Sequence, residues 1–177
     1  MSALITSIPI DRLKHYAINQ INTFFPDGNI VEYDDSELNE AFMDALKRLE
    51  FCFEHITNPR YSIFDDKHVV HPYFQHTNSE QYCTFLYFLS NSLWKLYPDK
   101  SWICDKLILL NKTLHCCWYT YKVKLPDIFY LIHPIGSIIG HAVYSNYLVI
   151  CHNVTIGERM DTSNSIGELC YLGGPQL

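Results

Sequence analysis

An apolar residue recurs at every sixth position in the last third of the chain. Before a pause, these marker positions are Ile132, Ile138, Tyr144, Ile150 and Ile156. The pattern stops over the segment ERMDTSNS and resumes at Ile166 and Leu172. A six-residue period fits neither an α-helix, which repeats about every 3.6 residues, nor the two-residue alternation of a strand. It is typical of a parallel β-helix, in which each hexapeptide forms one side of a three-sided coil.

Three hexapeptides complete one coil, so residues about 18 positions apart should stack on each other. We therefore expect Ile132 to stack on Ile150 and Ile138 on Ile156, with every marker side chain pointing inward. Glycine follows three of the later markers, which suits a tight corner where a side chain would be in the way. The alternative is an Ile-rich strand region whose spacing arose by chance.

The first part of the chain has a helical period instead. Apolar stripes at spacings of three and four predict helices over 10–25, 34–56, 80–97 and 102–118. Asp34 and Ser79 are the expected N-caps of the second and third helices, and the stretch 58–78 reads as a long loop. His115, near the end of the fourth helix, is expected at the surface.

The helical period ends at Pro126, and this point divides the chain. We predict an α+β fold, with an α-helical domain over 1–122 followed by a short parallel β-helix over 123–177. The 13 Tyr, 10 Phe and 3 Trp fit either a well-filled core or a large subunit interface, and both remain open.

Composition excludes several classes of function. The net charge is −6 and no basic cluster occurs, so nucleic-acid binding is not expected. The seven Cys are odd in number and contain no C-x-x-C, which indicates buried, reduced thiols and no metal site, as in a cytoplasmic protein. The N-terminus lacks the pattern of a signal peptide, and no apolar run is long enough to span a membrane.

Three segments resemble hexapeptide-repeat acyltransferases, in particular the serine acetyltransferase family. They are the helix-to-coil junction LPDIFYLIHPIGSIIG, the strand VICHNVTIG with its corner, and the later segment SIGELCYLGG. The resemblance covers roughly residue 82 to the end. It implies a left-handed β-helix, trimers or dimers of trimers, and sites between neighbouring subunits. The implied reaction, a step of cysteine biosynthesis, transfers acetyl from acetyl-CoA to the hydroxyl of L-serine or a related small acceptor.

The resemblance also suggests roles for individual residues. The reaction needs a general base beside the acceptor hydroxyl, and histidine suits this task at neutral pH. His141, in a Gly-His-Ala segment similar to the family's Asp-His-Ala, and His152 are the catalytic candidates. The other expected contacts are substrate-binding Asn146, His133 and Ser163, and cofactor-binding Gly157, Gly173 and Gly174. No metal is expected, because the spacing of the three His matches no metal-ligand motif.

The sequence departs from the family pattern in three places. No Asp stands beside either catalytic candidate, the interrupting loop carries Ser163 where the family has a His, and the hexapeptides end at LGGPQL after about two and a half coils, against the ~3 repeats that a solenoid usually needs. The alternative function is therefore a catalytically inactive, shortened hexapeptide-repeat module for oligomerisation or interaction.

Overall fold

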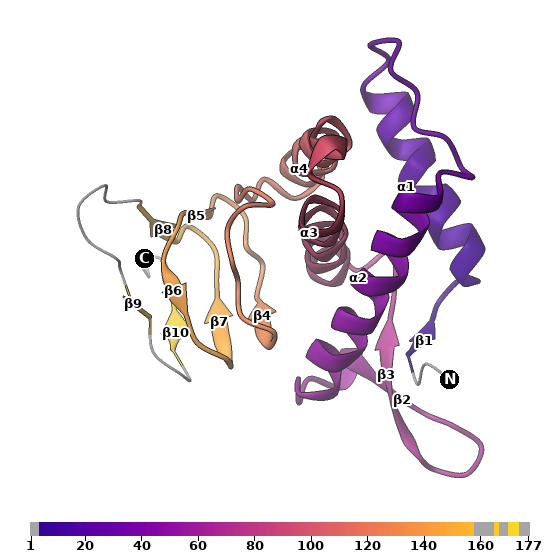
Figure 1. Ribbon diagram of the computed structural model, residues 1–177. Helices are drawn as coiled ribbons and strands as arrows, with labels where there is room; N and C mark the ends of the chain where they lie inside the picture. Colours follow the sequence, from indigo (N-terminus) through magenta and orange to yellow (C-terminus); the bar gives the residue numbers. More distant parts are fainter. Residues whose placement is uncertain (1–3, 158–164, 167–169, 174–177) are drawn as a thin grey trace.

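A computed structural model of the protein describes residues 4–157, 165–166 and 170–173. It is a mixed α+β structure with four helices and several short strands (Figure 1). The helices confirm the four helical segments expected from the sequence. Their bounds are α1 Ile10–Phe24, α2 Ser36–Glu54, α3 Ser79–Leu96 and α4 Ser101–His115, and short 3-10 turns lie at Pro59–Tyr61 and Pro98–Lys100.

Two expected helix caps are wrong by one residue. Asp35, not Asp34, accepts a hydrogen bond from the backbone N–H of Leu38 at 2.9 Å at the start of α2. Asn78, not Ser79, caps α3 by accepting from Gln81 N–H at 3.1 Å. Adjacent polar residues satisfy the cap preference equally well in sequence, and only the backbone conformation decides which side chain turns back.

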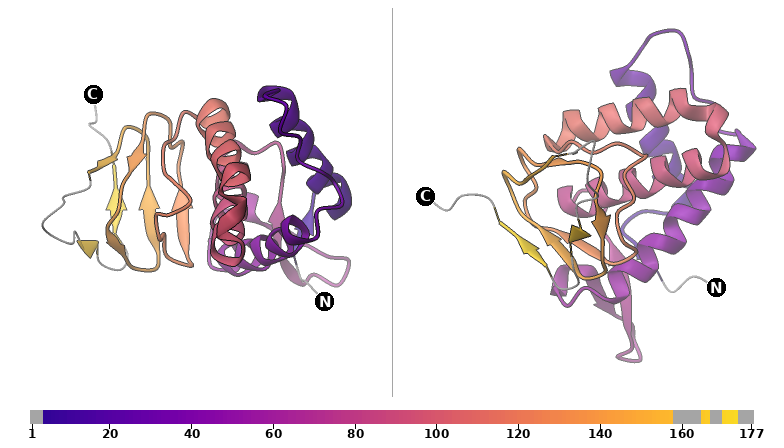
Figure 2. Two further views of the ribbon diagram at one scale, coloured as in Figure 1. Left: turned by 45° about the horizontal axis from the view of Figure 1, so that its top comes forward. Right: turned by 60° about the vertical axis from the view of Figure 1, so that its left-hand side comes forward.

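Helix α3 lies at the centre of the molecule. It packs against both α2 and α4 and also contacts the first strand of the C-terminal part. Every residue from 81 to 93 is consequently buried. Figures 1 and 2 show α2, α3 and α4 as a middle layer, with the C-terminal strands on one side and α1 with a small sheet on the other.

The stretch 58–78, expected as a loop, instead forms a β-hairpin. Strand β2 (Ser62–Phe64) pairs antiparallel with β3 (Val70–Phe74), and β1 (Ile5–Thr6) adds parallel to β3. The turn has no glycine. Asp65 closes it by accepting from Lys67 and Val69 N–H at 2.8 and 2.9 Å, and His68 takes the left-handed conformation at φ 60°. The turn signal in the sequence is therefore Asp65, whose side chain bonds back to the following backbone, and not a glycine.

The C-terminal strands form three parallel ladders. The first contains β4 (Phe129–Leu131), β7 (Leu148–Ile150) and β10 (Tyr171–Leu172); the second contains β5 (Ile138–Ile139) and β8 (Thr155–Ile156); the third contains β6 (Val143–Tyr144) and β9 (Ser165–Ile166). The chain visits the ladders in turn and then returns to the first. Paired residues are 17 to 22 positions apart, the range expected for one hexapeptide on each of three sides.

The register differs from the expected one in the first coil. Leu131, not Ile132, pairs with Ile150, and Ile139, not Ile138, pairs with Ile156. Ile138 is accordingly 45% exposed and Ile139 only 1%. The turn over 132–137 is longer than a hexapeptide corner, because the inward positions Leu131 and Ile139 are eight apart in the sequence instead of six. From Tyr144 to Ile156 the predicted markers do lie against the core.

The packing is continuous across the predicted boundary between residues 122 and 123. One hydrophobic cluster extends from Leu4 to Val154 and includes side chains of all four helices and of β4, β5 and β7. The hydroxyl of Tyr87 donates to Val123 O at 2.8 Å and accepts from Leu125 N–H at 2.9 Å. The helices therefore provide the base on which the first coil rests. In the described part of the chain, none of the helices has the length and the apolarity needed to cross a lipid bilayer.

Candidate functional site

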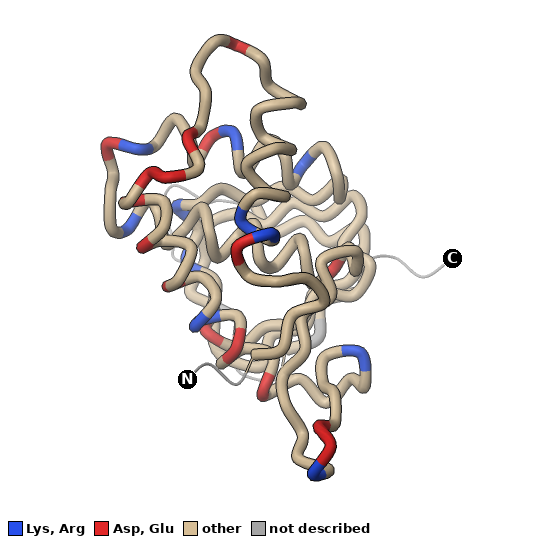
Figure 3. Tube along the Cα trace, turned by 90° about the vertical axis from the view of Figure 1, so that its right-hand side faces the viewer, with Lys and Arg blue, Asp and Glu red and all other residues tan. Residues whose placement is uncertain are grey.

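The ladder region is unusual in its charge. Residues 128–157 contain no Lys, Arg, Asp or Glu. Charged positions lie outside this run, on the helices, the hairpin and the connecting loops, where acidic and basic residues are interspersed (Figure 3). Histidine is the side chain suited to acid–base chemistry near neutral pH, and this run has three. A carboxylate that orients any of them must come from elsewhere in the chain.

The ladders define three corners. We call the turns at 132–137 and 151–154 the first corner, because both connect the first ladder to the second. The second corner, at 140–142, connects β5 to β6, and the third, at 145–147, connects β6 to β7. Each corner joins a different pair of ladders, so these positions decide which side chains are neighbours.

The structure separates the two predicted catalytic residues. His141 lies at the second corner, whereas His152 lies at the first corner together with His133. In the register of β4 and β7, His133 and His152 are equivalent positions in successive coils. Both His141 and His152 are exposed, and no ion pair joins either of them to a carboxylate among the described residues.

His133 has a carboxylate partner that the sequence analysis missed. Its Nδ1 lies 2.6 Å from Oε1 of Glu80, in the first turn of α3. The Glu80 side chain is only 15% exposed, whereas that of His133 is 70% exposed. In the sequence, Glu80 reads as an acidic residue that favours a helix start. Nothing local connects it to a residue 53 positions later.

Asn146, expected to bind substrate, has a structural role. Its Oδ1 accepts a hydrogen bond from Ile128 N–H at 3.1 Å across the third corner. It also lines a 460 Å³ cavity together with Lys124, Asp127 and the adjoining strand β6. The Asn146 amide therefore both ties the corner to the preceding coil and faces a polar cavity.

The expected cofactor-binding glycines are only partly described. Gly157 and Gly173 are exposed, and a Cβ atom placed on Gly157 would meet nothing within 4 Å. Gly157 thus lies on an open outer surface, which leaves room for a ligand chain. Ser163 and Gly174 lie outside the described residues.

A second cavity borders the first corner. It has a volume of about 540 Å³ and is lined by Lys112, Cys116, Trp118 and residues 136–138. The ammonium group of Lys112 lies 4.5 Å from the centre of the Trp118 ring. Trp118 forms a parallel bridge with Ile138, so an aromatic ring and an exposed aliphatic side chain extend the second ladder. The corner that bears His133 is therefore also one wall of this cavity.

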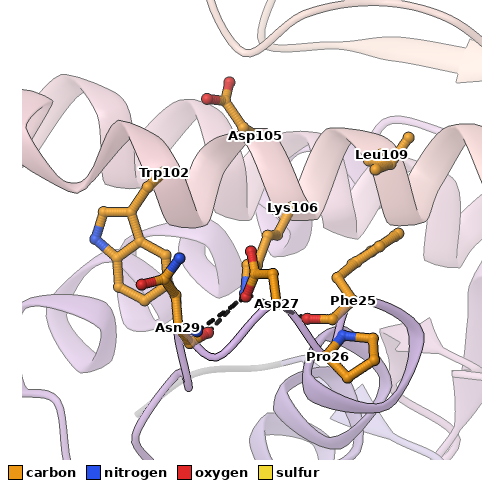
Figure 4. A pocket seen from close by; sticks show the side chains of 8 residues that line it. All are labelled: Phe25, Pro26, Asp27, Asn29, Trp102, Asp105, Lys106 and Leu109. Carbon is orange, nitrogen blue, oxygen red and sulfur yellow. Dashed lines mark hydrogen bonds and ion pairs between the residues drawn. The ribbon is translucent and has the colours of Figure 1, made fainter.

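A third cavity, of about 570 Å³, lies away from the ladders, between helix α4 and the loop after α1 (Figure 4). Lys106, the one cation among the described residues that line this cavity, is already paired with a carboxylate. The Lys106 Nζ bonds to Asp27 Oδ1 at 2.7 Å and Asn29 O at 2.6 Å and lies 5.4 Å from the centre of the Trp102 ring. The hydrogen bond from Lys106 holds the pKa of Asp27 below its usual value. These contacts tie the loop to α4.

His115 is buried, which corrects the expectation of a surface residue. Its Nδ1 lies 2.7 Å from Oδ1 of Asn111, whose amide donates to Cys83 O and to the hydroxyl of Tyr119. Burial raises the pKa of the Cys83 thiol, but hydrogen bonds from Cys117 and His115 outweigh it and lower that pKa. The cluster is closed to solvent, so it connects α3 and α4 internally and does not face a substrate.

Among the described residues, no group of three His, Cys, Asp or Glu could hold a metal ion. Neither protein-family models nor curated proteins give a match to this sequence. The choice of function therefore depends on the ladders, the corners and the side chains that meet there.

Proposed function

We propose that the chain is an acyltransferase built on a left-handed parallel β-helix, similar to serine acetyltransferases. The observation that supports this proposal best is the set of three parallel ladders, which the chain visits in rotation after a helical region. The Ile-His-Pro junction of the resemblance falls where β4 leads into the first corner. The reaction would transfer acetyl from acetyl-CoA to the hydroxyl of L-serine or of a related small acceptor.

The chemistry requires a base and then an acid. The acceptor oxygen attacks the thioester carbonyl while an imidazole nitrogen takes the hydroxyl proton. The tetrahedral intermediate collapses, the C–S bond breaks, and the imidazolium returns its proton to the CoA thiolate. Histidine can perform both steps near neutral pH. His141 and His152 are the proposed catalytic residues, with Asn146, His133 and Ser163 toward the acceptor and Gly157, Gly173 and Gly174 toward CoA.

A site shared between subunits would explain how residues at different corners of the chain could act together. Because His141 and His152 lie at different corners of one chain, they would meet only across an interface between two copies. The outer faces of the coils support such an interface. They expose apolar side chains from the uncharged run, namely Ile135, Ile138, Val143 and Tyr147. Apolar surface of this kind is typical of protein contacts, and we propose a homotrimer or a dimer of trimers.

The experiment is an assay of thiol release from acetyl-CoA with L-serine and with a panel of small hydroxyl acceptors. We expect release that depends on the acceptor. A reduction of kcat by about 100-fold or more in His141→Asn or His152→Asn, the range of general-base catalysis, would assign the base to that residue. The absence of release above background with every acceptor, at high protein concentration, would reject the proposed activity.

A non-catalytic assembly module is the second candidate. Two observations favour it: the side chain of Asn146 is engaged in the third corner, and neither His141 nor His152 pairs with a carboxylate among the described residues. This candidate predicts stable oligomers without affinity for CoA. Calorimetric titration with CoA distinguishes the two, because micromolar binding is expected only of the enzyme.

A further inference from the structure

We infer that the general base is His133, in place of His141 and His152, and that Glu80 is its positioning residue. This inference rests on the proposed acyl transfer and names the group that removes the acceptor proton. The geometry that suggests it is the 2.6 Å contact between His133 Nδ1 and Glu80 Oε1.

Glu80 provides a carboxylate that residues 128–157 themselves do not contain. Since residues 128–157 have no acidic side chain, a histidine there needs a carboxylate from outside this run. Of the three histidines in this run, His133 is the one for which the described structure provides such a pair. The pair joins the first turn of α3 to the first corner.

The division of burial within the pair suits an acid–base function. Glu80 is mostly shielded and is held at the N-terminal end of α3, where the helix dipole favours a negative charge. Ser79 Oγ also donates to its other oxygen, at 3.3 Å. The imidazole, by contrast, is largely exposed. With Nδ1–H donated to Glu80, the lone pair of Nε2 is left free to accept a proton from a substrate.

The backbone fixes the ring position. His133 has a φ of 46°, a left-handed conformation that costs energy for a residue other than glycine. The surrounding turn compensates: Ile135 N–H donates to His133 O at 2.7 Å, and Gly136 N–H donates to Cys116 O at 2.9 Å. Exposed ion pairs stabilise proteins little, so a strained conformation that presents an imidazole to a carboxylate points to a role beyond stability.

The first corner also provides room for a substrate. Residues 136–138, directly after His133 and its Pro, line the 540 Å³ cavity that contains Lys112 and Trp118. His133 and His152 belong to the same corner, although neither of them lines the cavity itself. His141, at the second corner, is not part of this arrangement in the same chain.

The test combines nitrogen NMR of the histidine rings with the thiol-release assay, on the wild type, His133→Asn, His133→Gln, Glu80→Ala and Glu80→Gln. In neutral His133 of the wild type we expect the proton on Nδ1, and Glu80→Ala should move it to Nε2. Glu80→Gln keeps an acceptor oxygen and should retain the Nδ1 proton. A matched control is Asp65→Asn, which removes the carboxylate from a second His–carboxylate pair of the described residues, with His71 at 3.1 Å on the hairpin.

In the assay, either His133 variant should lower kcat by about 100-fold or more. Glu80→Ala should lower it by about tenfold or more, with a smaller loss in Glu80→Gln and none in Asp65→Asn. Circular dichroism identifies any variant that fails to fold, and the remaining variants still decide the question. If the wild type is active and the folded His133 and Glu80 variants keep full kcat, the inference is overturned but the proposed function is not. The same holds if the tautomer of His133 is unchanged in Glu80→Ala. A wild type that releases no thiol with any acceptor rejects the proposed function together with the inference.

Discussion

At the scale of single residues, the first corner depends on backbone conformations that few residues adopt. Gly136 has a φ of 76°, and a Cβ atom on it would lie 2.4 Å from Oδ1 of Asn153 in the next coil. Asn153 itself is left-handed at φ 54°, and its N–H donates to Ile135 O at 2.9 Å. These contacts allow the turn at 151–154 to stack on the turn at 132–137, although the turn at 132–137 is longer than a hexapeptide corner.

Gly136→Ala should therefore destabilise the protein by about 1–2 kcal/mol, mainly through the left-handed backbone that alanine disfavours. Gly157→Ala is the matched control, because its added Cβ meets nothing within 4 Å and should change the free energy of unfolding by less than about 0.5 kcal/mol. Urea unfolding of both variants measures the difference. Equal effects of the two substitutions would contradict this account of the corner.

At the scale of elements, the loop after α1 is attached to α4 by one buried cation. The Lys106 side chain is only 8% exposed and bonds to Asp27 Oδ1 and to backbone carbonyls of the loop. In Figure 4 Asp105 points to the opposite side of α4, so Asp27 is the carboxylate that faces Lys106. The folded protein thus lowers the pKa of Asp27 through the hydrogen bond from Lys106.

A lowered pKa means that the Asp27 contribution to stability is present above its ordinary pKa of 3.8 and is lost as the pH falls below it. Asp27→Asn should consequently have a lower Tm than the wild type at neutral pH, and the difference should shrink below pH 3.8. Thermal unfolding across this range measures it, with Asp34→Asn, an exposed acid in the loop before α2, as control for the lost charge. A difference that is constant with pH would show that Asp27 does not act through its ionised form.

At the scale of the whole molecule, the two halves have different surfaces. The helices, the hairpin and their connecting loops carry charged residues, while residues 128–157 expose apolar side chains and contain no charge. One core joins the halves internally. The uncharged outer face of the coils is therefore the surface that we expect to be covered by other copies of the chain.

Val143→Lys, on strand β6, should convert the proposed trimer to a monomer of 20.7 kDa, because a lysine at an apolar interface would lose its hydration. Val70→Lys on the hairpin is the control, since the two valines are 58% and 57% exposed in the single chain. Sedimentation equilibrium gives the mass of each. A monomeric wild type, or a trimer unaffected by Val143→Lys, would show that β6 is not at an interface.

The sequence alone predicted the four helices and the parallel pairing of the later strands, because both follow from apolar periods that act locally. It could not predict the register of the first coil. The turn over 132–137 has two residues more than a hexapeptide corner, and only the burial of Leu131 and Ile139 in the structure reveals this. The sequence analysis also missed the hairpin, whose turn is closed by the Asp65 side chain and not by a glycine.

The candidate site, too, could be predicted from the sequence only in part. Counting in sixes identified a segment with three histidines, but it could not say which of them has a partner. The tertiary structure decided this by packing the first turn of α3 against the first corner, which places Glu80 beside His133. Periodicity determines which elements form, whereas contacts between residues 53 positions apart depend on how the elements pack, and the chemistry that we infer depends on those contacts.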